Sequence, residues 1–176
     1  MVDLHSIRDA AILNGLTESD LEKIGAIGSQ VAAEQGERLF ARATPSDTLL
    51  IILEGKFALT VMLRAAGDDV EVAIEALDAG DALGWSSLVP PHQSVYSAYC
   101  TERGSVAALD RRDMENLFAN DAGLGYRWMR NVSELVGRRV RHQQQLWIEE
   151  VEQSMSRVMF WTQQKVCTNW TQAVVS

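Results

Sequence analysis

The feature that most constrains the fold of this chain is a series of short β-prone runs between Val31 and Leu109. Glycine and aspartate separate the runs, and no long stretch with helical periodicity lies between them. Short strands with such regular punctuation predict a β-barrel or a double-sheet jelly roll. The runs cover residues 39–40, 49–53, 57–63, 70–77 and 96–109, and their separators are Gly36, Gly55, residues 67–69, residues 80–81 and Gly104.

Helical spacing of apolar residues flanks this β-region on both sides. Before it, residues 7–29 predict helical structure in which Thr17 and Asp20 occupy the positions of a capping box. After it, residues 110–118 predict a short helix that leads into a long one. The chain is therefore expected to be mainly β with flanking α. We expect N-terminal helices with a double-stranded β-helix, or jelly-roll barrel, over 1–123, a long C-terminal helix over 124–158 and a tail over 159–176.

The long helix carries an apolar stripe at steps of three, four or seven residues. The stripe can cover the barrel of the same chain, contact the identical helix of a second copy, or do both. Because the helix is longer than a barrel of this size needs as a cover, we expect a homodimer through it. The glutamines at 143–145 predict a looser contact there. The residues expected at the dimer contact are Met129, Val132, Val136, Val140 and Trp147.

Four of the five tryptophans lie in the C-terminal third of the chain, at Trp128, Trp147, Trp161 and Trp170. Tryptophan is enriched in the energetic centres of protein interfaces, although these side chains can also cover the barrel of their own chain. For Trp147 both interpretations stay open. For Trp161 and the tail around it, we expect contact with a protein partner.

Charge is divided unevenly along the chain. Residues 1–123 hold 9 basic and 20 acidic residues, a formal charge of −11, whereas residues 124–176 hold 7 basic and 4 acidic residues, a charge of +3. Each phosphate contact on DNA needs a cation, so this balance weighs against nucleic acid. Only 25 residues follow Val151, too few for a winged helix-turn-helix domain. We expect no DNA binding, and we expect the basic run 138–142 to be a solvated helix face that pairs with the acidic barrel.

Motifs for enzymatic chemistry are missing from the sequence. It has no phosphate-binding loop of the G-x-x-x-x-G-K-[ST] type, and no G-x-G-x-x-G follows a predicted strand. The three histidines lie far apart, so we expect no metal site. Only two cysteines occur, and Cys100 is expected to pack as a small apolar side chain. The missing motifs predict a non-enzymatic protein, and the low cysteine count is typical of the cytoplasm. Because no apolar run is long enough to span a membrane, we expect no membrane contact.

Five motifs mark the barrel region: GERLF at 36–40, Asp47, LLIILEG at 49–55, GDALG at 80–84 and VAALDR at 106–111. Together with the order of helix, barrel, short helix and long helix, they resemble the cyclic nucleotide-binding domain of the catabolite-activator-like and kinase-regulatory families. The resemblance implies a jelly roll with a ligand pocket. It also implies that occupation of the pocket shifts the position of the last helix.

In the family that the chain resembles, a phosphate-binding cassette follows the GDALG-like corner. It begins with Gly-Glu and ends at an arginine, where the glutamate holds the ribose and the arginine pairs with the cyclic phosphate. Here Gly84 matches the glycine, but Trp85 stands at the glutamate position, and Ser94 or its neighbour Val95 stands at the arginine position. No lysine or arginine occurs in residues 65–102. We therefore expect that cyclic AMP is not bound in the family's usual way.

Two uses of this cassette stay open. Trp85 can plug an unused pocket, or the turn can hold a weakly bound anion or nucleotide through Ser86, Ser87 and backbone amides. The stretch LGWSSLVPP at 83–91 is also similar to that of stand-alone bacterial proteins with this fold, some of them in redox or hydrogenase assemblies. We expect a regulatory or scaffolding module, with a nucleotide sensor and an accessory subunit of a redox complex as alternatives. The candidate ligand contacts are Gly84, Trp85, Ser86, Ser87, Ser94 and Val95.

Overall fold

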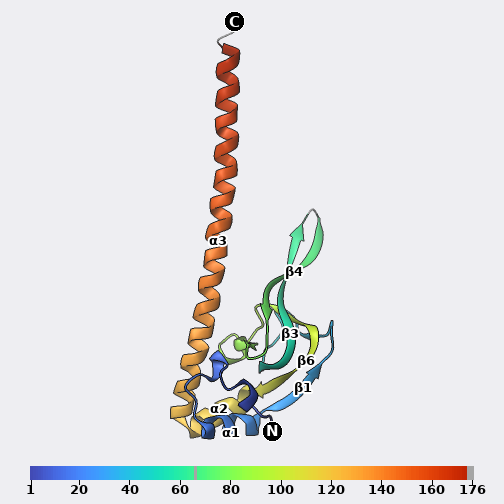
Figure 1. Ribbon diagram of the computed structural model, residues 1–176, viewed down its shortest axis with the longest axis vertical. Coiled ribbons are helices and arrows are strands. Elements are labelled where there is room, and N and C mark those ends of the chain that lie inside the picture. The colour runs from blue at the N-terminus through green and yellow to red at the C-terminus, as the bar shows by residue number, and fades with distance from the viewer. Residues whose placement is uncertain (66, 174–176) are drawn as a thin grey trace. The chain divides into compact units, whose positions relative to one another are not determined.

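A computed structural model describes residues 1–65 and 67–173 of the chain, and the side chains of residues 1–64 and 67–155. Its strands form one antiparallel sheet that curls into a barrel (Figure 1). The strand order is β1-β6-β3-β4, with β2 paired to β6 and β5 paired to β3. This arrangement confirms the predicted jelly roll. The strands are β1 (Ser29–Ala33), β2 (Arg38–Phe40), β3 (Thr48–Ala65), β4 (Asp68–Leu77), β5 (Ala82–Leu83) and β6 (Ser97–Asp110).

Strand β3 runs without a break through Gly55, where the sequence predicted a turn between two runs. The register against β6 shifts around this glycine, so the irregularity is a bulge within one long strand. Gly55 has a φ of +85°, and a Cβ at this position would lie 2.7 Å from the carbonyl oxygen of Arg103. The glycine therefore serves a close approach of two strands rather than the end of a strand.

Helical segments precede and follow the barrel. Short 3₁₀ turns, η1 (His5–Ile7) and η2 (Ala11–Leu13), lead into α1 (Glu18–Ile27). The predicted capping box is confirmed, because the Asp20 amide donates to Thr17 Oγ1 at 3.2 Å and the Thr17 amide donates to Asp20 Oδ2 at 2.9 Å. Asp110 caps the next helix. That helix is α2 (Arg111–Asn120), which is followed by α3 (Ala122–Ala173).

The barrel interior is filled by apolar side chains. Phe57 and Leu59 of β3 meet Ala98 and Cys100 of β6 in one buried cluster. Because strand side chains alternate between faces, these positions face the barrel interior together. The other buried members are Ala33, Ile52, Leu77, Leu83 and Val106, with Leu39, Phe40, Leu50, Ile74 and Tyr96 packed against them.

The first turns of α3 form part of the same body. Leu124, Trp128, Val132 and Leu135 are buried, and the Trp128 ring lies 6.2 Å from that of Phe118 in α2. Two residues considered for a partner contact, Trp128 and Val132, thus lie in the core of their own chain. Their burial explains why the body extends beyond the barrel itself.

The chain divides into a compact unit, Met1–Leu135, and a second unit, Val136–Ser176. Helix α3 continues through residues 143–145, so the glutamine run does not interrupt it. In the part of the chain that the structure describes, no helix is long and apolar enough to cross a membrane. The side chains of Trp161 and Trp170 lie outside the described residues.

Candidate functional site

A tight corner between β4 and β5 leads into the predicted cassette, residues 84–95. The Asp78 amide donates to Asp81 Oδ2, and the Asp81 amide donates to the Asp78 carbonyl oxygen, each at 3.0 Å. Ile52 of β3 donates to the Asp81 carbonyl oxygen and accepts from the Gly80 amide, each at 2.9 Å. These bonds fasten the corner to the middle of the barrel and thereby position the cassette against β3.

The cassette opens at Gly84, which has a φ of +77°. A Cβ at this position would lie 2.7 Å from the carbonyl oxygen of Thr48, so both the backbone angle and the space require glycine. One 3₁₀ turn follows, η3 (Trp85–Leu88), in which the Ser87 amide donates to the Gly84 carbonyl oxygen at 3.0 Å. Ser86 and Ser87 are buried in this turn, and Trp85 is half-buried.

The rest of the cassette folds back on residues 43–46. His92 donates from Nδ1 to the Ser87 carbonyl oxygen at 3.0 Å, which ties this loop to η3. The Ser94 amide donates to the Thr44 carbonyl oxygen at 3.0 Å, and the Ser94 carbonyl oxygen accepts from the Ala43 amide at 2.8 Å. Ser94 is buried, whereas Val95 is exposed. The loop therefore contacts η3 through His92 and residues 43–44 through Ser94, and it leaves Val95 exposed.

Two buried hydroxyl groups in the cassette stand out. Neither Ser87 Oγ nor Ser94 Oγ has a hydrogen-bond partner among the described residues. Leaving a buried hydroxyl without a partner costs about 1–3 kcal/mol. Residues 84–95 contain no lysine or arginine, so the cassette offers hydroxyl and amide donors but no permanent positive charge.

The Cys100 thiol lies in the barrel core and does not present a reactive group. Its Sγ donates to the Glu102 carbonyl oxygen at 3.1 Å. Burial raises the pKa of the Cys100 thiol, and the carboxylates of Glu37 and Glu34 raise it further. The thiol is therefore neutral and packs as a small apolar group, as predicted. Among the residues with described side chains, no three His, Cys, Asp or Glu gather where they could hold a metal ion.

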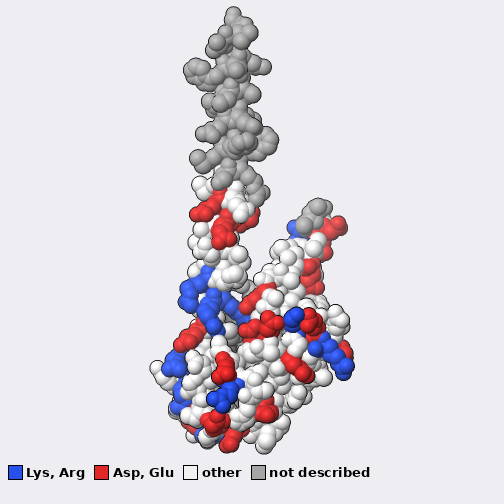
Figure 2. All heavy atoms as spheres, in the orientation of Figure 1, with Lys and Arg blue, Asp and Glu red and all other residues white. Residues whose placement is uncertain are grey.

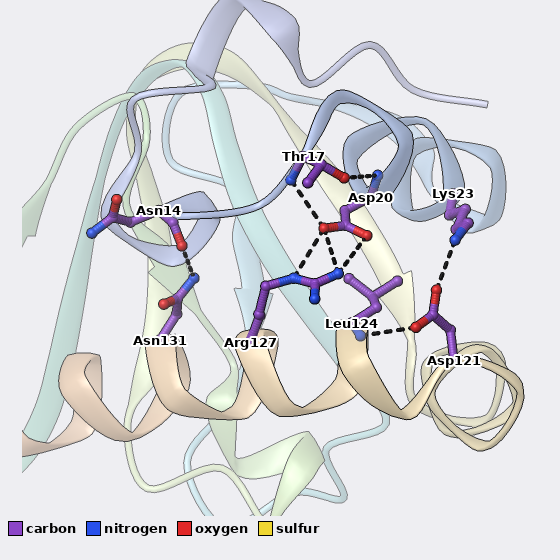
Figure 3. Close-up of polar contacts among 8 residues, drawn as sticks. All are labelled: Asn14, Thr17, Asp20, Lys23, Asp121, Leu124, Arg127 and Asn131. Atoms are coloured by element: carbon purple, nitrogen blue, oxygen red, sulfur yellow. Dashed lines mark hydrogen bonds and ion pairs between the residues drawn. The ribbon is translucent and has the colours of Figure 1, made fainter.

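A second polar cluster joins α1 to the start of α3 (Figure 3). Arg127 donates from Nε and Nη2 to the carboxylate of Asp20, at distances of 2.7 to 3.1 Å. Burial opposes ionisation of Asp20, but the Thr17 amide and the Arg127 guanidinium together hold the pKa of this carboxyl below its ordinary value of 3.8. We call Asp20 and Arg127 the helix clamp.

Further contacts support the helix clamp on both sides (Figure 3). Lys23 of α1 donates to Asp121 Oδ2 at 2.7 Å, at the end where α3 begins. Asn131 donates from Nδ2 to the carbonyl oxygens of Ile12 and Asn14, at 3.0 and 2.7 Å. These partners are about a hundred residues apart in sequence, so no local motif indicates them. The cluster fixes the start of α3 on the N-terminal helices.

Comparisons with known proteins agree on one fold. Residues 30–121 match the family model of the cyclic nucleotide-binding domain. A protein from Geobacter metallireducens, described as a cyclic nucleotide-binding protein, is 24% identical with a TM-score of 0.66, over 80% of this chain and 99% of that chain. A cyclic nucleotide-binding domain from Methylobacillus flagellatus is 21% identical with a TM-score of 0.69, over 80% of this chain and 77% of that chain.

The catabolite activator protein of Thermus thermophilus is also similar, at 21% identity and a TM-score of 0.65. The match covers 78% of this chain and 61% of that chain. A comparison with curated proteins found no match. At these identities the solved structures establish the fold alone. The family match spans more than half of the 176 residues, and with the jelly roll and its glycine corners it places the chain in the cyclic nucleotide-binding domain family.

Proposed function

We propose that the chain is a non-enzymatic regulatory or scaffolding module of the cytoplasm that does not bind cyclic AMP through the family's usual charged contacts. The observation that carries this proposal is the neutral cassette. Trp85 and Ser94 stand where the resemblance implies a glutamate and an arginine, and no lysine or arginine occurs in residues 65–102.

A cyclic phosphate carries a negative charge that a binding site must compensate. Moving a charge out of water without an opposite charge costs several kcal/mol. A neutral hydrogen bond returns only about 0.5–1.5 kcal/mol net. A phosphate buried in the cassette would be held only by the hydroxyls of Ser86, Ser87 and Ser94 and by the amides of η3. These neutral hydrogen bonds do not offset the free-energy cost of burying its charge.

A second candidate function is a sensor for a small polar ligand, held by neutral donors in a rearranged pocket. The observation that favours it is the pair of buried hydroxyls, Ser87 Oγ and Ser94 Oγ, which have no partner among the described residues. A ligand that accepted from these hydroxyls would remove the cost of leaving them unpaired. A nucleotide or another weakly bound anion fits this chemistry.

A thermal-shift panel separates the two functions, with cyclic AMP, cyclic GMP, cyclic dinucleotides, ATP and NAD(P)H as the probes. A ligand at a hundred times its Kd adds about 2.7 kcal/mol, and each kcal/mol raises the Tm of a domain of this size by about 2–4 °C. The first proposal predicts no shift with any probe. A shift with one probe that disappears in the Ser87→Ala/Ser94→Ala variant establishes the sensor instead.

We also propose that the chain forms a homodimer through α3. Three residues of the predicted stripe, Met129, Val140 and Trp147, are exposed, and Val136 is half-buried. Light scattering should give twice the 19.5 kDa of one chain, and Val140→Asp/Trp147→Ser should give a single chain. A single-chain mass for the unmodified protein would contradict the dimer. A protein partner at Trp161 and the tail stays part of this proposal, and co-purification tests it.

A further inference from the structure

The outer halves of β3 and β4 form a two-stranded hairpin that extends beyond the barrel (Figure 1). β4 is the terminal strand of the sheet, so among the described residues one of its edges pairs with β3 and the other pairs with no strand. In an antiparallel ladder, alternate residues direct their N–H and C=O groups away from the neighbouring strand. The outward groups of β4 are therefore available to a further strand.

One face of this hairpin is apolar. Leu63 pairs with Val70 across the two strands, and Val61 pairs with Val72. Leu63, Val70 and Val72 are 49%, 45% and 38% exposed. Because directly paired residues lie on the same face, these side chains form one continuous apolar strip beside the free edge.

The other face and the tip carry carboxylates. Glu71 accepts from Thr60 Oγ1 of β3 at 2.6 Å and from the Tyr99 hydroxyl of β6 at 3.0 Å, so its carboxylate is directed across β3, away from the free edge. Residues 61–77 contain four acidic residues and one arginine. Figure 2 shows acidic side chains along the hairpin that projects from the barrel. The docking edge, which we define as β4 with the paired residues of β3, is thus both apolar and acidic.

The acidic charge of the docking edge determines which kind of strand can bind there. If a second copy added to the sheet through its own β4, Asp68 and Asp69 would meet an equally acidic strand, and like charges on neighbouring strands are destabilising. A segment that carries lysine or arginine at alternate positions meets opposite charges instead. Apolar residues at the positions between them cover the strip on the other face, because strand side chains alternate.

We propose that the docking edge binds an extended segment of another protein, basic and apolar at alternate positions, which joins the sheet as a strand beside β4. Backbone hydrogen bonds supply the affinity in this mode of recognition, and the alternating side chains supply the selectivity. Neither the cassette nor the dimer helix takes part, so the proposal stands apart from the function proposed above.

Hydrogen–deuterium exchange on the full chain tests the proposal, with a short blocked peptide of alternating lysine and valine as the probe. We expect slower exchange in residues 68–77 when the peptide is present. A peptide with glutamate in place of lysine, and one with proline at its centre, should leave the exchange unchanged, because proline removes a donor and disrupts a strand.

Two matched variants test the charge and the apolar strip separately. Asp68→Lys/Asp69→Lys should weaken binding about three- to tenfold, as expected for exposed charge pairs. Val70→Thr/Val72→Thr keeps β-branched side chains and should weaken binding as well. The control Asp9→Lys/Glu22→Lys makes the same charge change on exposed residues outside the hairpin and should bind as the unmodified chain does.

Three outcomes would overturn the proposal. The lysine–valine peptide leaves exchange in residues 68–77 unchanged at millimolar concentration. The proline or glutamate peptide binds equally well. Without any peptide, exchange in residues 68–77 slows as the protein concentration rises, which assigns the docking edge to a second copy of the chain.

Discussion

Replacement of Arg127 by methionine should destabilise the chain in a way that depends on pH. Methionine keeps most of the length of the side chain but removes the guanidinium that donates to Asp20 at 2.7 to 3.1 Å. Asp20 is only 2% exposed, so its carboxylate is left buried without an opposite charge.

The size of the loss follows from the exposure of the two partners. Removing one partner of a buried ion pair costs about 3–5 kcal/mol. The Arg127 side chain is 33% exposed, so water replaces part of the interaction, and the Thr17 amide still donates to Asp20. We therefore expect a loss of about 2–3 kcal/mol in the free energy of unfolding, or a fall of about 4–12 °C in Tm.

The sign of the pH dependence follows from the pKa of Asp20. In the folded chain this pKa lies below the ordinary 3.8, so the stabilisation is present above the ordinary value and is lost as the pH falls through the lowered one. In the Arg127→Met variant only the Thr17 contacts still oppose the effect of burial, so the pKa of Asp20 should rise. The difference in stability between the two proteins should thus be largest at neutral pH and shrink in acid.

Urea unfolding, followed by tryptophan fluorescence at neutral pH and at about pH 4, measures both effects. Arg130→Met is the matched control, because Arg130 is an exposed arginine of the same helix, and it should lose less than about 0.5 kcal/mol. The reasoning is refuted if Arg127→Met loses no more stability than Arg130→Met at neutral pH, or if its loss is the same at both pH values.

Three further outcomes are expected. Gly55→Ala should lower the free energy of unfolding by about 1–3 kcal/mol in thermal unfolding, because of its φ of +85° and the close Arg103 carbonyl oxygen; an unchanged Tm would contradict this. In a Cys167→Ser background, Cys100 should react with a disulfide reagent only after unfolding, since burial raises its pKa; rapid reaction of that folded variant would contradict this. Ser87→Ala should cost nothing, whereas Ser97→Ala should cost about 1 kcal/mol because Ser97 Oγ accepts from the Arg42 amide; equal Tm changes would contradict both.

Local sequence signals predicted the fold well where one segment determines its own structure. The capping box of Thr17 and Asp20 needs only residues within one helical turn, and the structure has it as expected. The prediction of a turn at Gly55 was wrong because the role of this glycine depends on residues outside its own segment. Glycine in a β-prone run indicates either a turn or a close approach of two strands, and only the position of Arg103 and Gly104 on the neighbouring strand decides between them.

Contacts between distant residues lay outside the reach of sequence reasoning. Asp20 and Arg127 are 107 residues apart, and in the sequence each is indistinguishable from an ordinary charged residue of a helix. The apolar spacing of α3 could not separate Val132, which is buried in the body, from Trp147, which is 68% exposed. In the cassette, the sequence predicted the neutral side chains, but only the fold brings the Ser87 carbonyl oxygen to His92 and buries the hydroxyls of Ser87 and Ser94.

The central claim is that the neutral cassette does not hold a cyclic phosphate, and a calorimetric titration with cyclic AMP tests it most directly. The unmodified chain should give no saturable heat at millimolar ligand, whereas Trp85→Glu/Ser94→Arg restores both charged contacts and should bind with one ligand per chain. Tight one-to-one binding by the unmodified chain would contradict the claim, and no binding by the double variant would contradict the assignment of Trp85 and Ser94 to those positions.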